Sequence, residues 1–119
     1  VTGDLSFFYD SNAMWNNYIP KNFKMIIINN SGGGIFRILP GEKEKEYYKT
    51  YFETTHDLNA AHLSKMYNWG YTSAKDKSSS IEAIKSLFSS QHQKPQILEI
   101  FTPRTLNDEV LLNYFKFIN

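Results

Sequence analysis

The stretch Met25-Ile26-Ile27-Ile28-Asn29-Asn30-Ser31-Gly32-Gly33-Gly34-Ile35-Phe36 passes from an unbroken apolar run into a glycine-rich loop. Unbroken hydrophobicity, rather than alternation, is typical of a parallel strand that is buried on both faces. The polar residues and successive glycines that follow indicate a turn. The stretch therefore predicts a buried strand whose carboxyl end opens directly into a loop.

Helical patterns lie on both sides of this strand. Residues 8–18 are expected to form a helix that Pro20 ends, because proline lacks a backbone donor and restricts the residue before it. Farther along the chain, Asp57 is a good N-cap for a helix that continues to about Asn68, and Gly70 is suited to end it. The polar, tyrosine-rich segment 42–55 between them predicts neither a helix nor a strand clearly.

The remaining residues continue the alternation. Tyr71 and Thr72 are expected in a short strand, and the apolar run 97–101 after Pro95 predicts another. Two further helices are expected, each opened by a capping pattern and each with an apolar stripe: Ser79-x-x-Glu82 with Ile81, Ile84 and Phe88, and Thr105-x-x-Asp108 with Val110, Tyr114 and Phe117. This alternation predicts an α/β fold with a mainly parallel sheet flanked by helices, in one domain over residues 1–119.

Composition and charge exclude several classes of function. Thirteen Lys and Arg residues are spread along the chain against twelve Asp and Glu, for a net charge of +1, so no basic stripe indicates a nucleic-acid partner. The alternating charge run 42–46 is expected to be solvated. The absence of cysteine excludes disulfides, thiolate zinc sites and a cysteine nucleophile. No apolar run approaches the ~20 residues that cross a bilayer, and no signal peptide is visible, so a cytoplasmic protein without a membrane span is expected.

Two segments carry residue types that suit a diphosphate held through magnesium. Gly3-Asp4-Leu5-Ser6 lies just before the first expected helix, and the loop after Asn29 lies just after a strand, so both are expected at the carboxyl edge of the sheet. Mg²⁺ prefers hard oxygen ligands, which the Asp4 carboxylate, the Asn30 amide and a carbonyl of the glycine loop can supply. Ser6 and backbone N–H groups at a helix start can receive phosphate oxygens.

Each segment alone is a weak signal, since a Gly-Asp pair is commonplace and an Asn-Asn-Ser-Gly stretch is more often a plain turn. Their spacing strengthens the prediction. Between Leu5 and Asn29 lie 29 − 5 − 1 = 23 residues, which is enough for one helix and one returning strand. The chain also opens on this motif at Val1, without an initiator Met, and we therefore expect a piece of a larger protein.

The combination resembles the thiamine-diphosphate enzymes, which carry a Gly-Asp pair followed at a characteristic distance by Asn-Asn, here Gly3-Asp4 and Asn29-Asn30. The resemblance implies thiamine diphosphate and Mg²⁺ as cofactors, with Mn²⁺ as an alternative metal. It implies Asp4, Asn30 and the Gly32 carbonyl as metal ligands. The cofactor-binding residues that it implies are Gly3, Asp4, Leu5, Ser6, Asn30, Gly32 and Gly33.

Further matches resemble the branch of this family that acts in menaquinone biosynthesis. They are Gly-Asp-Leu-Ser-Phe at residues 3–7, Tyr9-Asp10-x-Asn12, and Ile35-Phe36-x-x-Leu39-Pro40. This branch decarboxylates 2-oxoglutarate and adds the resulting succinyl carbanion to isochorismate, which makes it a transferase. The resemblance implies that Ile35, Phe36 and Leu39 line the pocket where substrate meets cofactor.

The resemblance also implies that part of the active site lies outside these residues. The chain corresponds to the C-terminal cofactor-binding (pyrophosphate) domain, whereas the glutamate that activates the cofactor belongs to another domain, usually of a second subunit. No catalytic residue is therefore expected here, the chain alone is expected to be inactive, and the whole protein is expected to be a homo-oligomer. Two features depart from the pattern. The gap of 23 residues is short, and Arg37 is untypical; it either points to solvent or lies near a substrate carboxylate.

Two alternatives stay open. The chain could belong to another thiamine-diphosphate enzyme, such as an acetolactate synthase or a 2-oxoacid decarboxylase, although Leu5-Ser6 and the run 32–36 argue against it. It could instead be a non-catalytic α/β module whose glycine loop is structural or binds another phosphate.

Overall fold

A computed structural model describes residues 1–39, 45–89 and 91–118. The charge run at 42–46 lies largely outside the described residues. The chain divides into two compact units. We call Val1–Asn29 with Asn59–Phe101 the sheet unit, and Asn30–Leu58 with Thr102–Asn119 the loop unit.

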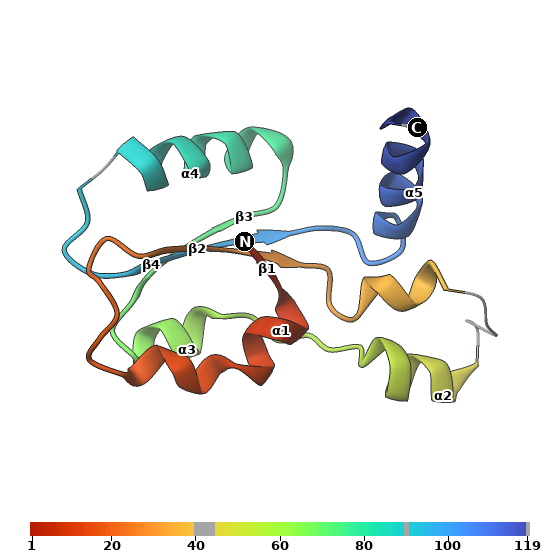
Figure 1. The fold of residues 1–119 in the computed structure, drawn as a ribbon, viewed down its shortest axis with the longest axis horizontal. Coiled ribbons are helices and arrows are strands. Elements are labelled where there is room, and N and C mark those ends of the chain that lie inside the picture. Colours follow the sequence, from red (N-terminus) through yellow and green to blue (C-terminus); the bar gives the residue numbers. More distant parts are fainter. Residues whose placement is uncertain (40–44, 90, 119) are drawn as a thin grey trace. The chain divides into compact units, whose positions relative to one another are not determined.

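The sheet unit contains a four-stranded, all-parallel sheet with the strand order β1-β2-β4-β3. Its strands are β1 (Thr2–Gly3), β2 (Lys24–Asn29), β3 (Gly70–Ala74) and β4 (Gln96–Phe101). Its helices are α1 (Asp4–Tyr9), the 3₁₀ helix η1 (Ser11–Trp15), α3 (Ala61–Met66) and α4 (Lys77–Ser89). Figure 1 shows α1 and α3 on one face of this sheet and α4 on the other. The predicted α/β fold with a mainly parallel sheet is confirmed.

The apolar runs form strands, as predicted, and these are the two central strands of the sheet, β2 and β4. Their side chains alternate between two cores. Ile27 and Ile97 are buried in one cluster that includes Trp69 of the α3–β3 connection. Leu98 is buried in a second cluster with Leu87 of α4. Each fully buried aliphatic side chain of this size contributes about 2 kcal/mol relative to exposure. Both faces of the sheet are therefore covered, which explains why the two central strands carry unbroken or nearly unbroken apolar runs.

The register of the sheet brings the ends of β1 and β2 to the same edge. Gly3 lies opposite Ile28, and Asn29 at the end of β2 lies opposite Phe101 of β4. Asp4 follows β1 directly, so Asp4 and Asn29 both lie at the carboxyl edge of the sheet. This confirms the expectation for Asp4, although the first helix begins earlier than predicted.

The boundaries predicted for the first helix, residues 8–18, are wrong at both ends. Gly3 has extended backbone angles (φ −84°, ψ 164°) and serves as the N-cap, so α1 starts at Asp4. After Tyr9 the chain continues only as the 3₁₀ helix η1. The Asn16 side chain then donates to the Ala13 carbonyl and accepts from the Tyr18 N–H, and such local bonds compete with further helix.

The predicted caps of α3 are also wrong. The Asn59 side chain, rather than Asp57, accepts a hydrogen bond from the N–H of Ala61 at the start of the helix. The helix ends before Asn68, which adopts a left-handed conformation (φ 60°) that asparagine tolerates better than most residues. Gly70 does not stop the helix but opens β3. The strand expected at Tyr71 and Thr72 is confirmed.

A capping box does open α4, but with different members from those predicted. The Asp76 carboxylate accepts a hydrogen bond from the Ser79 N–H at 2.9 Å, and the Ser79 hydroxyl accepts one from the Asp76 N–H at 3.3 Å. The helix thus starts at Lys77, one turn before the predicted Ser79–Glu82 box would place it. Leu87 is its buried side chain. The predicted stripe is exposed in the described chain: Ile81, Ile84 and Phe88.

The loop unit contains short helices and the last helix of the chain. They are the 3₁₀ helix η2 (Gly34–Arg37), α2 (Glu46–Tyr48), the π-helix η3 (Lys49–Glu53) and α5 (Asn107–Ile118). The start of α5 lies two residues after Thr105, and the Asn107 side chain donates to the Thr102 hydroxyl. The stripe Val110, Tyr114 and Phe117 is exposed. Among the described residues, no helix is long and apolar enough to cross a membrane.

Candidate functional site

Asp4 is a buried carboxylate at the start of α1. Asp4 is only 2% exposed, and its Oδ1 accepts a hydrogen bond from the Leu5 N–H at 2.9 Å. The next residues of the predicted cofactor segment are less enclosed, since Leu5 is half-buried and Ser6 is exposed. The sheet unit therefore presents Asp4 as a fixed, acidic group at the carboxyl edge of β1.

Asn29, at the end of β2, is held by a carboxylate that was not among the predicted site residues. Its amide donates to Oε1 of Glu99 on β4 at 2.7 Å. Oε2 of Glu99 accepts from the Ala60 N–H at 3.0 Å and from the Tyr71 hydroxyl at 2.6 Å. Glu99 and Asn29 are both almost fully buried, so each polar atom needs such partners.

Tyr71, which donates to Glu99, stays protonated in this network of hydrogen bonds. Burial is the main cause that raises the pKa of Tyr71 above its usual range, and the hydrogen bond to Glu99 adds to it. The sequence did contain a signal for this network, because Glu99 interrupts an apolar run that is otherwise typical of a buried strand. A carboxylate at such a position requires several donors around it.

One position of the loop that begins the loop unit requires glycine, and a second leaves little room for a side chain. Gly32 is buried and has a φ of 152°, and a Cβ added there would lie 2.8 Å from the carbonyl oxygen of Glu53. The N–H of Gly33 donates to that same carbonyl at 2.6 Å. At Gly34, an added Cβ would lie 2.5 Å from the side-chain nitrogen of Asn30. The glycine loop is therefore packed closely against its own unit.

The predicted pocket residues differ in exposure. Ile35 is 67% exposed and Leu39 is 49% exposed, so both present apolar surface. Phe36 is half-buried and packs edge-to-face on Phe52, with ring centroids 5.9 Å apart. Tyr48 stacks on Phe52 and donates its hydroxyl to the Phe36 carbonyl. Burial, followed by the nearby Glu53 carboxylate, raises the pKa of Tyr48, which therefore remains a donor.

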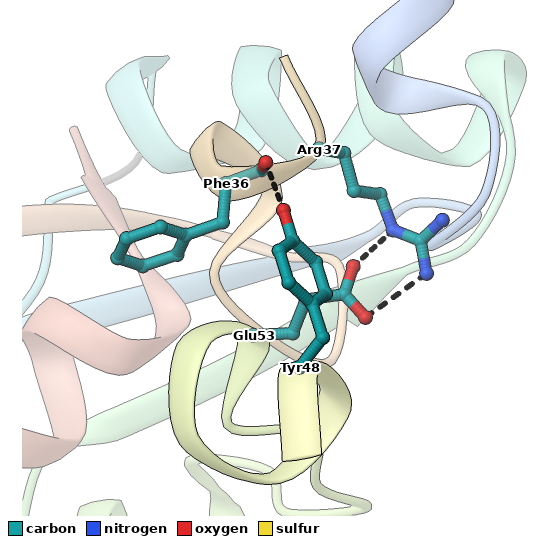
Figure 2. Close-up of polar contacts among 4 residues, drawn as sticks. All are labelled: Phe36, Arg37, Tyr48 and Glu53. Carbon is teal, nitrogen blue, oxygen red and sulfur yellow. Dashed lines mark hydrogen bonds and ion pairs between the residues drawn. The ribbon is translucent and has the colours of Figure 1, made fainter. Parts of the chain in front are cut away.

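Arg37 forms an ion pair with Glu53, an outcome that neither interpretation of Arg37 included. Figure 2 shows the two side chains facing each other, with Nε paired to Oε1 and Nη2 donating to Oε2 at 3.0 Å. The side chain of Glu53 is 2% exposed and that of Arg37 is 15% exposed. The interpretation that Arg37 points to solvent is therefore wrong.

The predicted site residues are divided between the two units. The sheet unit contains Gly3, Asp4, Leu5 and Ser6; the loop unit contains Asn30, Gly32, Gly33, Ile35, Phe36 and Leu39. The magnesium site therefore stays a prediction. Within the described ranges, no three His, Cys, Asp or Glu side chains gather in a way that could hold a metal ion. The predicted ligand set does not need such a cluster, since it combines one carboxylate with amide and carbonyl oxygens.

A separate cavity of about 290 Å³ lies within the sheet unit. Its walls are mainly apolar and include Phe7, Met14, Phe23 and Trp69. Of the predicted cofactor residues, Ser6 contributes to these walls whereas Asp4 does not. This cavity is accordingly not the predicted metal site.

Comparison with known proteins shows that the chain is similar to several proteins named 2-succinyl-5-enolpyruvyl-6-hydroxy-3-cyclohexene-1-carboxylate synthase. The protein from Flavobacterium psychrophilum is 60% identical over 116 residues, which are 98% of this chain and 21% of that protein. The protein from Christiangramia forsetii is 58% identical over 118 residues, or 99% of this chain and 20% of that protein. The protein from Porphyromonas gingivalis is 37% identical over 119 residues, which are 100% of this chain and 20% of that protein.

The chain spans about a fifth of the length of the curated relatives that it matches. No protein-family model matches it.

Proposed function

Because the chain belongs to the family of these synthases, as a segment about a fifth of their length, we propose that it is the cofactor-binding domain of such an enzyme. The whole protein would decarboxylate 2-oxoglutarate with thiamine diphosphate and add the succinyl unit to isochorismate, a step of menaquinone biosynthesis. The observation that carries this proposal is the 60% identity over 98% of the chain.

The magnesium ion is assigned to the Asp4 carboxylate, the Asn30 amide oxygen and the Gly32 carbonyl. Three observations support this ligand set. Asp4 is a buried carboxylate at the carboxyl edge of the sheet. Asn30 follows directly on Asn29, which ends β2 at that edge. Gly32 has a positive φ that a residue with a side chain rarely adopts. Mg²⁺ commonly binds through few protein oxygens together with phosphates and water.

The diphosphate is assigned to the backbone and side chains around Gly3, Leu5, Ser6 and Gly33. Thiamine diphosphate, when bound, supplies the electron sink for decarboxylation. The role of this chain is to hold and orient its diphosphate end. Glycine suits this role because the backbone can approach an anion without a Cβ between them.

The residues Ile35, Phe36 and Leu39 are assigned to the substrate pocket. Exposed apolar side chains such as Ile35 and Leu39 are suited to exclude water from reacting groups when they are covered. Phe36 is anchored through Phe52 and Tyr48. We assign no catalytic residue to this chain; the activating carboxylate and the other pocket walls would come from the rest of the protein and from a second subunit. The chain alone would therefore have no synthase activity.

A substrate comparison tests the proposal. The full-length protein that contains these residues is assayed with thiamine diphosphate, Mg²⁺ and isochorismate, with either 2-oxoglutarate or pyruvate as the second substrate. Product is expected from 2-oxoglutarate and not from pyruvate. Turnover of pyruvate in place of 2-oxoglutarate would instead identify an enzyme of the acetolactate synthase or 2-oxoacid decarboxylase type.

A further inference from the structure

Glu53 holds the segment Gly33–Arg37 at both of its ends. At the first end, its main-chain carbonyl accepts the Gly33 N–H at 2.6 Å. At the second end, its side chain pairs with the guanidinium of Arg37. Between these two points lies Phe36, whose carbonyl accepts the Tyr48 hydroxyl (Figure 2). The segment that carries two of the assigned pocket residues is thus fixed by contacts within its own unit.

The ion pair has the geometry of a rigid clamp. Two nitrogens of one guanidinium edge meet the two oxygens of one carboxylate, an arrangement that fixes direction as well as distance. Both side chains are largely buried, so removing either one would leave the other charge without its partner in a poorly solvated place. Such a pair favours one conformation of the segment that connects its members.

The same geometry bears on the second interpretation of Arg37, a contact with a substrate carboxylate. The edge formed by Nε and Nη2 is one of two edges of the guanidinium that can grip a carboxylate in two places, and Glu53 occupies it. An arginine that bound substrate through this edge would have to exchange partners.

We propose that Arg37 and Glu53 form a positioning pair that holds Ile35 and Phe36 in place for the reaction, and that Arg37 does not bind the substrate carboxylate. This inference rests on the proposed function, because it assigns a role to the same pocket. Glu53 and Arg37 are positioning residues here; neither is expected to touch substrate or cofactor.

A double-mutant cycle in the full-length protein tests the pair. The variants are Arg37→Met, Glu53→Gln and the double variant, with Glu46→Gln as a matched control at an exposed position of α2. Each single variant is expected to lower kcat by a similar factor, and the double variant is expected to be no worse than either. Contacting residues commonly show such non-additivity, with a coupling on the order of tenfold. The KM for 2-oxoglutarate and isochorismate should change little, and Glu46→Gln should change neither constant.

Additive losses would overturn the pair. A large rise in the KM for one substrate in Arg37→Met, with no such rise in Glu53→Gln, would also overturn it and would make Arg37 a substrate ligand. If Glu53→Gln does not fold, Arg37→Lys replaces it in the comparison. This variant keeps the charge but loses the fork, and it should lower kcat without raising KM; a wild-type kcat in Arg37→Lys would contradict the proposal.

Amide hydrogen exchange separates this inference from the proposed function, because it needs no activity. The peptide that covers residues 32–39 is expected to exchange faster in both single variants than in the wild type or in Glu46→Gln. Faster exchange in a protein that lacks synthase activity would uphold the pair and refute the function. Unchanged exchange in both single variants would refute the pair, whatever the activity.

Discussion

Asn29, the last residue of β2, donates its side-chain amide at 2.7 Å to Glu99, which lies in the middle of β4. Glu99 also accepts the N–H of Ala60 before α3 and the hydroxyl of Tyr71 on β3. One buried carboxylate therefore connects three parts of the sheet unit. Because Asn30 follows Asn29 directly, this network fixes the point from which the proposed magnesium loop leaves the sheet.

Replacing the central carboxylate should weaken the fold. Glu99→Gln keeps the size of the side chain but turns one acceptor into a donor that faces other donors. A loss of about 1–3 kcal/mol in the free energy of unfolding is expected, since a buried polar group is left unsatisfied. Urea denaturation of Glu99→Gln beside Glu82→Gln, an exposed position on α4, measures this. Equal midpoints for the two variants would show that the network contributes nothing to stability.

Tyr71 should make the stability of the chain sensitive to alkaline pH. Its pKa in the folded chain is raised by burial and by Glu99, whereas the unfolded chain titrates near the ordinary value of 10.0. Above pH 10 the unfolded state therefore loses a proton that the native state keeps, so the contribution of Tyr71 is complete below pH 10 and is lost as pH rises. Denaturation midpoints between pH 8 and pH 11, chosen around the ordinary value of 10.0, should fall more steeply in the wild type than in Tyr71→Phe. Parallel curves would contradict this linkage.

Gly32 should not tolerate a side chain. Its φ of 152° and the 2.8 Å approach of the Glu53 carbonyl to an added Cβ both oppose alanine. Gly32→Ala is expected to cost about 1–3 kcal/mol, as for other residues forced into a sparsely populated conformation. Gly3→Ala is the matched control, because an added Cβ there meets nothing within 4 Å. The thermal midpoints of the two variants are compared. A larger drop in Gly3→Ala than in Gly32→Ala would contradict this prediction.

The observed cap of α4, Asp76, can be compared with Asp57, which was predicted as a cap but does not serve as one. Asp76→Ala removes the carboxylate that accepts the Ser79 N–H and should lower the thermal midpoint, whereas Asp57→Ala, at a predicted cap that the structure does not use, should not. Hydrogen bonds from Ser79 are the main cause that lowers the pKa of Asp76. Its stabilising contribution is therefore present above the ordinary carboxylate pKa and is lost as pH falls through the lowered value. A larger effect from Asp57→Ala would contradict the observed cap.

The features that could be predicted are those with a periodic or local signal. The apolar runs around Ile27 and Leu98 identified the two central strands, because burial on both faces excludes polar residues almost everywhere along them. The exception, Glu99, was missed because its meaning depends on donors from Asn29, Ala60 and Tyr71, which are distant in sequence. Such partners become visible only when the strands are placed side by side.

Caps and ion pairs were predicted less well, for related reasons. Asp76 and Ser79 lie three positions apart, and both are good N-cap residues. The sequence alone therefore does not show which of them caps the helix. Arg37 and Glu53 are sixteen residues apart, and they meet only because the loop unit folds back on itself. The composition of the glycine loop indicated a site, but it did not reveal that Glu53 packs against Gly32.

The assignment of Asp4 to the magnesium ion is tested by a Mg²⁺ titration of synthase activity in the full-length protein with saturating thiamine diphosphate. Asp4→Asn is compared with Asp10→Asn, an exposed aspartate just after α1. Asp4→Asn is expected to raise the Mg²⁺ concentration for half-maximal activity by at least about tenfold, since even substitutions of residues that only orient the metal ligands cost that much. Asp10→Asn is expected to leave it unchanged. Equal Mg²⁺ requirements in Asp4→Asn and the wild type would contradict a role of Asp4 as a magnesium ligand.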